Sequence, residues 1–366
     1  MKITHIHIER FRGFQNEDFE VGSLLTAIAG QNGTQKSTLL GIITQTFTLK
    51  TEDSMRVEKP LCGGSYISAF KDKFRLSPTF DKPKGHEWTI SFDAGMDDFT
   101  VESIKRTGDP NVRFWKKGAR QEGDGYISFP TIFLSLKRLV PVAEEAKIIT
   151  DDTLLTQEEL NEFKQLHNKI LIAQTPISSA TTITSKNKQS IGVSTELYDW
   201  NQNSMGQDNL GKIILALFSF KRLHDKYPRQ YKGGILAIDE MDATMYPASQ
   251  VELLKVLRKY ASKLNLQILF TTHSMSLLKA MDDLVQEVTK KEETANQAKI
   301  LYLKKVDDKI AIKQGVNFKG IQLDLNVVAE GNNRKKNRIT AYTEDKENIL
   351  FVKAILKSKA FVLDFV

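Results

Sequence analysis

The stretch of sequence that decides the fold is Gly30-Gln31-Asn32-Gly33-Thr34-Gln35-Lys36-Ser37-Thr38. A short apolar strand is predicted before it, over residues 24–29, and residues 37–43 have helical character. Strand, glycine-rich loop and helix in this order form the context of a phosphate-binding P-loop. The backbone amides of such a loop and the free N–H groups of the helix N-terminus hold phosphate oxygens. We therefore expect this stretch to bind phosphate groups.

The residues of the loop have separate expected roles. Lys36 adds a positive charge and Ser37 ligates Mg²⁺, so ATP and Mg²⁺ are the expected cofactors. The expected nucleotide-binding residues of the loop are Gly30, Asn32, Gly33, Thr34, Gln35, Lys36, Ser37 and Thr38. Gln35 departs from the pattern G-x-x-x-x-G-K-[ST], where glycine precedes the lysine. A side chain there crowds the loop or touches the nucleotide. The alternative is an accidental strand-to-helix turn, and no cation besides Lys36 is evident near the loop.

Two carboxylates end a second apolar run. Residues 234–238 are predicted to form a buried strand, and Asp239 and Glu240 follow it directly. In phosphoryl-transfer sites one acidic residue holds Mg²⁺ and another group orients the attacking water. Asp239 is therefore the expected metal ligand, through water, and Glu240 the expected catalytic residue. A solvent-exposed acidic pair is the alternative, which the preceding P-loop disfavours.

A third motif resembles the signature sequence of ABC-type ATPases. Residues 203–208 read Asn-Ser-Met-Gly-Gln-Asp and stand before a helix predicted from Leu210. The resemblance rests on Ser204, Gly206 and Gln207, with Met205 in place of one glycine of the pattern. In that family the signature serine and helix N-terminus face the γ-phosphate bound by the partner protomer. A simple helix cap is the alternative.

His273 completes the resemblance to ABC-type ATPases. It follows a strand predicted over residues 267–271, like the switch histidine of that family. The family resemblance implies that this imidazole contacts the γ-phosphate, and that the protein works as a dimer, or a higher homo-oligomer, closed over two nucleotides. A structural histidine is the alternative.

Three runs indicate a branch of the family. Residues 6–14, with the turn Phe-Arg-Gly-Phe, resemble the first strand of RecF, SMC and OLD-type ATPases. Residues 239–247 resemble the D-E-P-E-x-x-x-H-P run of the OLD-like branch, with departures at 241, 242 and 246. Residues 133–141 resemble the L-x-x-x-R-L-x-P segment of PtuA-like ATPases from Septu and retron defence systems, which implies Arg138 as a nucleotide-site or coupling residue. A surface cation is the alternative for Arg138, and the absence of a long heptad arm disfavours a true SMC protein.

The expected fold class is α/β, an ABC-type P-loop ATPase head with a mixed sheet, over residues 1–330. Short period-2 runs within 51–130 predict an inserted antiparallel β lobe. A second insertion, residues 150–195, is expected to hold a helix from Thr156, behind a capping box with Glu159, and then a mobile Ser/Thr-rich loop over 175–194.

Residues 338–366 resemble the beginning of a TOPRIM domain, with a first strand, an acidic turn and an apolar helix over 348–356. In OLD nucleases the glutamate of that turn belongs to a metal site, so the resemblance implies Glu344 as a metal ligand. A whole TOPRIM domain needs more chain than follows here. The alternatives are a longer protein and a vestigial lobe.

Composition adds weaker expectations. The net charge of +7 suits a polyanionic partner, although the 52 basic residues are spread along the chain of 366 residues. The single cysteine, Cys62, excludes an intrachain disulfide and has no neighbours at zinc-ligand spacing. No signal-peptide pattern and no long apolar run occur, so we expect a cytoplasmic protein without membrane contact.

The function expected from these motifs is that of an ATP-binding and hydrolysing ATPase that dimerises on nucleotide and regulates a nuclease in anti-phage defence. Expected partners are a nuclease or reverse transcriptase of the same system, and DNA or reverse-transcribed DNA. One alternative is a RecF-like DNA-repair clamp. Another is a nucleotide-binding scaffold with little hydrolysis, which Gln35 favours.

Overall fold

The computed structural model describes residues 1–50, 52–66, 70–77, 79–93, 95–105, 112–118, 124–139, 148–151, 154–173, 175–184, 189–330, 339–343, 345–356 and 363–365. The chain divides into two compact units, Met1–Val316 and Asn317–Val366. The division falls before helix α7 (Phe318–Glu330), whereas the sequence analysis extends the first domain to the end of that helix.

The first unit is built on a mixed sheet, as expected. Within the described residues it has six strands in the order β16-β15-β3-β14-β13-β9. Their bounds are Lys309–Lys313, Ala298–Val306, Leu25–Gly30, Leu266–Thr272, Gly234–Ile238 and Thr131–Leu134. β16 is antiparallel to β15 and the other pairs are parallel. Every residue of β3, β13 and β14 is buried, as in parallel strands covered on both faces.

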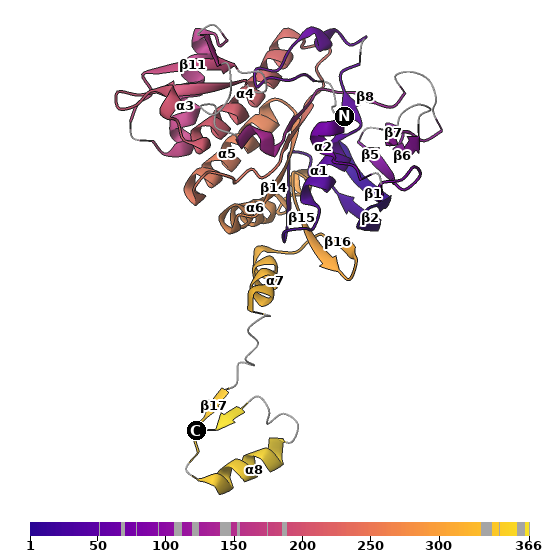
Figure 1. The fold of residues 1–366 in the computed structure, drawn as a ribbon, viewed down its shortest axis with the longest axis vertical. Helices are drawn as coiled ribbons and strands as arrows, with labels where there is room; N and C mark the ends of the chain where they lie inside the picture. Colours follow the sequence, from indigo (N-terminus) through magenta and orange to yellow (C-terminus); the bar gives the residue numbers. More distant parts are fainter. Residues whose placement is uncertain are drawn as a thin grey trace. The chain divides into compact units, whose positions relative to one another are not determined.

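Helices cover this sheet on both sides (Figure 1). α1 (Lys36–Thr44) packs on β3 and β14 from one side. On the other side lie α5 (Pro247–Lys263), which packs on β14, and α6 (Met275–Val288), which packs on β15. α4 (Met205–Lys226) begins five residues before the predicted start at Leu210, because Ser204 caps it. The predicted α/β alternation is confirmed.

A second sheet differs from the expected inserted lobe. Its order is β2-β1-β5-β6-β7, antiparallel throughout. The strands are Phe14–Glu20, Ile3–Phe11, Glu87–Phe92, Phe99–Lys105 and Val112–Lys116. Strands from within 51–130 thus extend the amino-terminal hairpin, because Trp88 and Ile90 pair with Ile8 and Ile6 and share one core with α1. The predicted strand near residue 127 is not in this sheet: β8 (Ile127–Ser128) runs parallel to β4 (Phe47–Thr48).

The prediction of a mobile loop over residues 175–194 is wrong. This range holds β11 (Ser179–Thr184) and β12 (Gln189–Ser194), which form a sheet with β10 (Ile149–Asp151). The polar composition hid alternating apolar side chains, and Ile183, Ile191 and Val193 are buried. Threonine, isoleucine and valine are also β-branched, which suits a pleated sheet. α4 packs on β12.

The helix predicted beside this sheet is confirmed. α3 (Gln157–Leu171) is capped by Thr156 and Glu159, whose side chains bond each other's backbone N–H as a capping box. The second unit contains β17 (Ile339–Ala341), α8 (Lys346–Leu356) and β18 (Leu363–Phe365), with β18 parallel to β17. Among the described residues no helix has the length and apolarity needed to cross a membrane.

Candidate functional site

The P-loop leaves the carboxyl end of β3 where β15 lies closely beside it. A Cβ atom on Gly30 would lie 2.5 Å from the carbonyl oxygen of Leu303 and 2.8 Å from Oγ1 of Thr34. Only glycine fits this approach without a shift of backbone. Thr34 closes the loop by donating a 2.8 Å hydrogen bond to the carbonyl of Gln31.

Lys36 is held against its own loop. Its Nζ donates to the carbonyls of Gly30, at 3.0 Å, and Gln31, at 2.9 Å. Burial lowers the pKa of Lys36, while the carboxylates of Glu240, Asp239 and Asp242 favour its charged form. One ammonium therefore stands among the loop carbonyls and within the field of three carboxylates.

Ser37 and Asp239 meet across 202 positions of the sequence. The Ser37 hydroxyl donates to Oδ1 of Asp239 at 2.9 Å. They meet because β13, which ends before Asp239, and β3, which leads to the P-loop, both flank β14 in parallel. Hydroxyl and carboxylate oxygens are ligands that Mg²⁺ accepts, usually with waters and substrate phosphates. Among the described residues no group of three or more His, Cys, Asp or Glu side chains forms a metal cage.

Thr271 is a site residue that the sequence analysis missed. Its Oγ1 donates to Oδ1 of Asp239 at 2.7 Å and accepts from the backbone N of Glu240 at 2.6 Å. Glu240 has a φ of 48°, the left-handed region that costs an ordinary residue free energy. The hydroxyl therefore fixes the backbone turn that separates the two carboxylates. The sequence signal that could have identified Thr271 is its position near the end of a buried strand, β14, beside the strand that ends before Asp239.

His273 lies next to the same turn, at the carboxyl end of β14. Its backbone N donates to Oδ1 of Asp242 at 3.3 Å. Burial and the charge of Lys36 lower the pKa of His273, against the opposing effect of Asp242, Glu240 and Asp239. The imidazole is therefore neutral near pH 7. Asp242, a departure from the OLD-like pattern, is thus in contact with the residue after β14.

Gln35 adopts the conformation that explains why glycine is usual there. Its φ is 62° and its ψ is 32°, which is left-handed, and it caps α1. This conformation costs an L-residue about 1–2 kcal/mol. Its side chain lies against the turn between β1 and β2, since a Cβ on Gly13 would be 2.9 Å from Nε2 of Gln35.

The signature residues begin α4. Ser204 and Gln207 form a capping box, in which Ser204 N donates to Oε1 of Gln207 and Gln207 N donates to Oγ of Ser204. The alternative of a helix cap is thus correct for the local structure. Glycine at position 206 allows α4 to approach the carbonyl oxygen of Thr244 closely, because an added Cβ atom would lie only 2.5 Å from that oxygen. Asn209 Nδ2 also donates to the carbonyl of Ala243, at 3.0 Å. The first turn of α4 therefore packs on the loop that follows Glu240.

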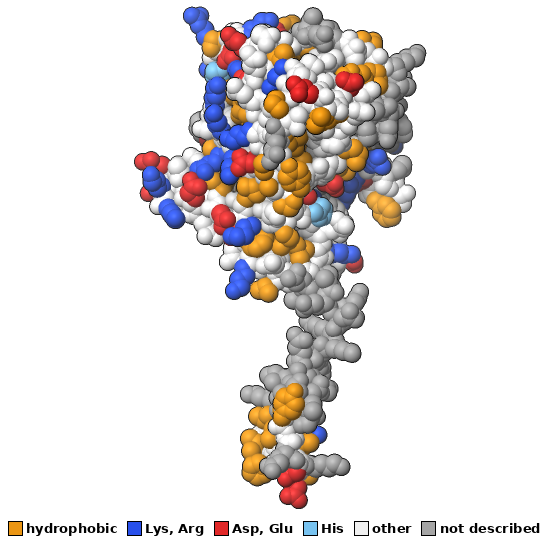
Figure 2. Space-filling view, turned by 90° about the vertical axis from the view of Figure 1, so that its left-hand side faces the viewer, with side chains coloured by type: hydrophobic (Ala, Val, Ile, Leu, Met, Phe, Trp, Pro, Cys, Tyr) orange, Lys and Arg blue, Asp and Glu red, His pale blue; other side chains and the backbone are white. Residues whose placement is uncertain are grey.

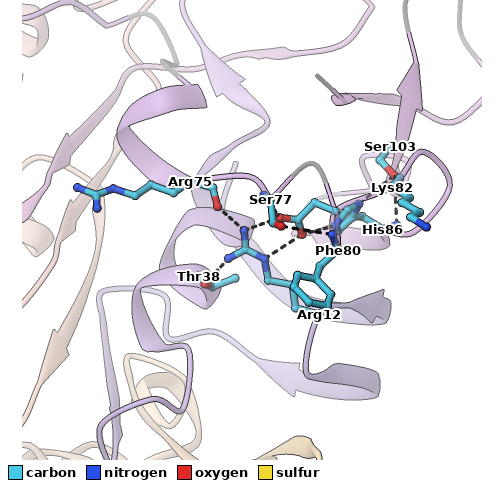
Figure 3. A network of polar contacts seen from close by, with 9 residues as sticks. Arg12, Thr38, Arg75, Ser77, Phe80, Lys82, His86 and Ser103 are labelled. Atoms are coloured by element: carbon cyan, nitrogen blue, oxygen red, sulfur yellow. Dashed lines mark hydrogen bonds and ion pairs between the residues drawn. The ribbon is translucent and has the colours of Figure 1, made fainter. Parts of the chain in front are cut away.

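Arg12 was also missed, and the expectation that no cation besides Lys36 lies near the loop is wrong. Nη1 of Arg12 lies 3.4 Å from Oγ1 of Thr38, in the first turn of α1 (Figure 3). The β1–β2 turn reaches α1 because Gly13 allows Ile310 and Gln35 to pack on it, and Ile310 N donates to the Gly13 carbonyl at 2.8 Å.

Two predicted site residues have no described side chain. Arg138 belongs to a 3-10 turn, Leu136–Leu139, but its side chain lies outside the described residues. Glu344, the metal ligand implied by resemblance to TOPRIM domains, lies wholly outside them.

Comparisons with known proteins bear on the family and the fold of this chain. A family model described as AAA ATPase domain matches residues 1–190 and 135–278. Among solved structures, an SMC head bound to the C-terminal winged-helix domain of ScpA is similar, with a TM-score of 0.51 and 13% identity over 88% of this chain and 100% of that chain. The SMC head domain from Thermotoga maritima has a TM-score of 0.47 and 14% identity, over 86% of this chain and 100% of that chain.

The recombination mediator protein RecF-ATPrS of the RecFOR pathway has a TM-score of 0.42 and 12% identity, over 86% of this chain and 98% of that chain. A search of curated proteins finds no match. Such low identities show a shared fold alone. That fold is the expected α/β ABC-type P-loop ATPase head.

Proposed function

We propose that this chain, which belongs to the AAA ATPase domain family, binds and hydrolyses ATP with Mg²⁺ in composite sites formed by two copies of itself. The observation that carries the proposal is the convergence of Lys36, Ser37 and Asp239, which follow the carboxyl ends of β3 and β13, the two strands that flank β14 in parallel. Ligands of open α/β sheets bind at this edge.

The residues have distinct proposed tasks. The P-loop amides and Lys36 hold the β- and γ-phosphates, for which Lys36 leaves its two carbonyl partners. Ser37 and Asp239 hold Mg²⁺, which when bound neutralises charge on those phosphates. Glu240 orients the attacking water, and His273 contacts the γ-phosphate through an imidazole nitrogen. Arg12 lies on the Thr38 side of the loop and contacts the phosphate nearer the ribose.

The dimer is supported by what surrounds the signature. Ser204 is exposed at the N-terminus of a long helix, an end whose N–H groups and dipole favour an anion. Exposed apolar side chains lie around it: Ile172, Leu197, Met205 and Tyr246 are 52%, 78%, 44% and 54% exposed. Gln207 Nε2 of the signature donates to the hydroxyl of Tyr198, next to Leu197, and the hydroxyl of Tyr246 donates to the carbonyl of Leu171, next to Ile172. Hydrophobic side chains also gather on the face seen in Figure 2, the side of the first unit on which α3, α5 and α6 lie in Figure 1. A second copy that supplies its γ-phosphate to Ser204 would cover such a surface.

Phosphate release tests the activity. We expect Mg²⁺-dependent release by the wild-type chain that Lys36→Ala and Glu240→Gln both abolish. Release by both variants at the wild-type rate would show that another site, or a contaminant, hydrolyses the nucleotide.

The regulated process is proposed to be nuclease action in anti-phage defence, of Septu, retron or OLD-like kind. The support is the resemblance of residues 133–141 to PtuA-like ATPases and of residues 338–366, with Glu344, to a TOPRIM beginning. Proposed partners are a nuclease or reverse transcriptase, and DNA. The solved SMC head, which is bound to a domain of ScpA, supports the proposal of a protein partner.

A RecF-like clamp is the second candidate, and the net charge of +7 favours its DNA contact. Co-purification from the native operon separates the two. Recovery of a nuclease or reverse transcriptase supports defence, whereas recovery of duplex DNA without either supports the clamp.

A further inference from the structure

Arg12 is fixed in place by a buried carboxylate. Nε of Arg12 donates to Oδ1 of Asp81 at 3.0 Å, and Nη2 donates to Oδ2 at 2.9 Å. Nη2 also donates to the carbonyl of Arg75 at 2.7 Å, which leaves Nη1 directed at Thr38 (Figure 3). This bidentate geometry is the strongest that arginine makes with a carboxylate.

Asp81 is itself fixed from three sides. Its side chain is 2% exposed, and beyond Arg12 it accepts from the backbone N of Ser77 at 2.7 Å and from Nε2 of His86 at 3.1 Å. Because Nε2 carries the proton toward the carboxylate, Nδ1 of His86 accepts from the hydroxyl of Ser103 at 3.0 Å. His86 is also 2% exposed. A continuous chain of hydrogen bonds thus runs from β6, which holds Ser103, to the turn that holds Arg12.

The charge of Asp81 opposes the attraction of Arg12 for a phosphate. A carboxylate beside the guanidinium lowers the positive potential at Thr38, so Coulomb attraction alone would favour a neutral residue at position 81. The free arginine side chain, however, loses rotamer freedom when it is fixed. A carboxylate that fixes the guanidinium before the ligand arrives removes that loss from the binding step. The two effects predict opposite changes when the carboxylate is removed.

We propose that Asp81 is a positioning residue for nucleotide binding: it holds the guanidinium of Arg12 at Thr38, ready for the phosphate nearest the ribose. The proposal rests on the proposed function of the P-loop. Lys36 serves the β- and γ-phosphates and Ser37 serves Mg²⁺. Thr38 is one residue further along α1, so the contact of Arg12 does not require a γ-phosphate. The affinities for ADP and for ATP should therefore depend equally on Asp81.

The experiment is a calorimetric titration of the full chain with ADP and with ATP. We expect Arg12→Ala to weaken both nucleotides by about tenfold or more, the loss of one charge-assisted contact. Asp81→Asn is expected to weaken both by a similar factor of about three to ten, as the preset orientation is lost. In the Arg12→Ala background, Asp81→Asn should have no further effect on affinity, because it acts through Arg12.

Three further variants make the result interpretable. Arg12→Lys keeps the charge and the native Asp81 but loses the bidentate fork, so it should weaken ADP and ATP alike even where Asp81→Asn folds poorly. Glu87→Gln is the matched control, since Glu87 of β5 pairs with Arg10 of β1 at 3.0 Å and with Lys117 at 2.5 Å, and neither partner belongs to α1; the nucleotide affinity of this variant should equal that of wild type. Lys36→Ala tests the site itself, and unchanged binding there would overturn the proposed function instead.

Two outcomes overturn the inference while Lys36→Ala still abolishes binding. One is wild-type or tighter affinity in Asp81→Asn, the result that Coulomb attraction alone predicts. The other is a further loss of affinity when Asp81→Asn is added to Arg12→Ala, which would show that Asp81 acts through the general stability of the loop.

Discussion

Oγ1 of Thr271 donates a 2.7 Å hydrogen bond to Oδ1 of Asp239, and the same oxygen accepts from the backbone of the next residue, Glu240. One hydroxyl on β14 thus orients the proposed metal ligand and holds the strained turn that presents the proposed catalytic carboxylate. The relationship ties the two acidic residues to the strand that also ends at His273.

Thr271→Val should therefore impair hydrolysis more than nucleotide binding. The substitution keeps the shape of the side chain but leaves the buried N–H of Glu240 without its acceptor, at a cost of about 1–3 kcal/mol. We expect phosphate release to fall by about tenfold or more and the melting temperature to fall as well. Thr271→Ser, which keeps the hydroxyl, should restore most of the release rate. A valine variant with wild-type turnover would show that the hydroxyl does not position either carboxylate.

Lys36→Ala should abolish nucleotide binding. It removes a charge-assisted contact to phosphate worth about 1.5–3 kcal/mol, and Arg12 lies beside Thr38, where we expect it to contact a different phosphate. Isothermal titration with ATP measures the effect, and circular dichroism should show an unchanged fold. Unchanged ATP affinity would mean that the loop is not the binding site.

Gln35→Gly should raise the rate of hydrolysis. Glutamine occupies a left-handed position, with φ 62°, and its amide lies against Gly13 of the turn that carries Arg12. It therefore limits the movement of the loop around the phosphates, and we expect wild-type turnover below about 1 s⁻¹, the low end of enzyme rates. A slow site would let bound ATP persist as a signal. Brisk wild-type release that glycine does not increase would leave an ordinary ATPase.

His167 should make the fold less stable as the pH falls. Burial in α3 lowers the pKa of His167 from 6.5 to about 4. Between these values the unfolded chain binds the proton that the folded chain refuses, so the free energy of unfolding decreases from about pH 6.5 downward. From pH 7 to pH 5 this amounts to about 2 kcal/mol. Urea unfolding at both pH values should show His167→Leu losing about that much less than wild type. Equal losses in the two proteins would mean that His167 does not carry this pH dependence.

The parts of the site that could be predicted from the sequence are those that a few consecutive residues form by themselves. Strand, loop and helix around Lys36, and a buried strand ending at Asp239, each follow from a pattern of a few residues. The alternation of strands and helices predicts a parallel sheet, and a parallel sheet brings the P-loop and the acidic motif to the same edge.

The parts that were missed depend on contacts between distant residues. Residues 175–194 look too polar for a core, yet Ile191 and Val193 gain their burial from the hairpin and from α4. Arg12 reaches Thr38 only because the second sheet packs its turn onto α1. Thr271 is one threonine among many until β14 sets it beside Asp239.

The central claim, a nucleotide-dependent dimer with composite sites, is tested most directly by analytical ultracentrifugation of Glu240→Gln with and without ATP. The variant keeps the groups that bind nucleotide and loses the carboxylate that orients water, so it should remain closed. We predict the mass of one chain, 41.5 kDa, without ATP and twice that mass with it. Ser204→Arg in the same background should restore the single-chain mass in ATP, because it blocks the signature. A mass of one chain in Glu240→Gln both with and without ATP would contradict the account.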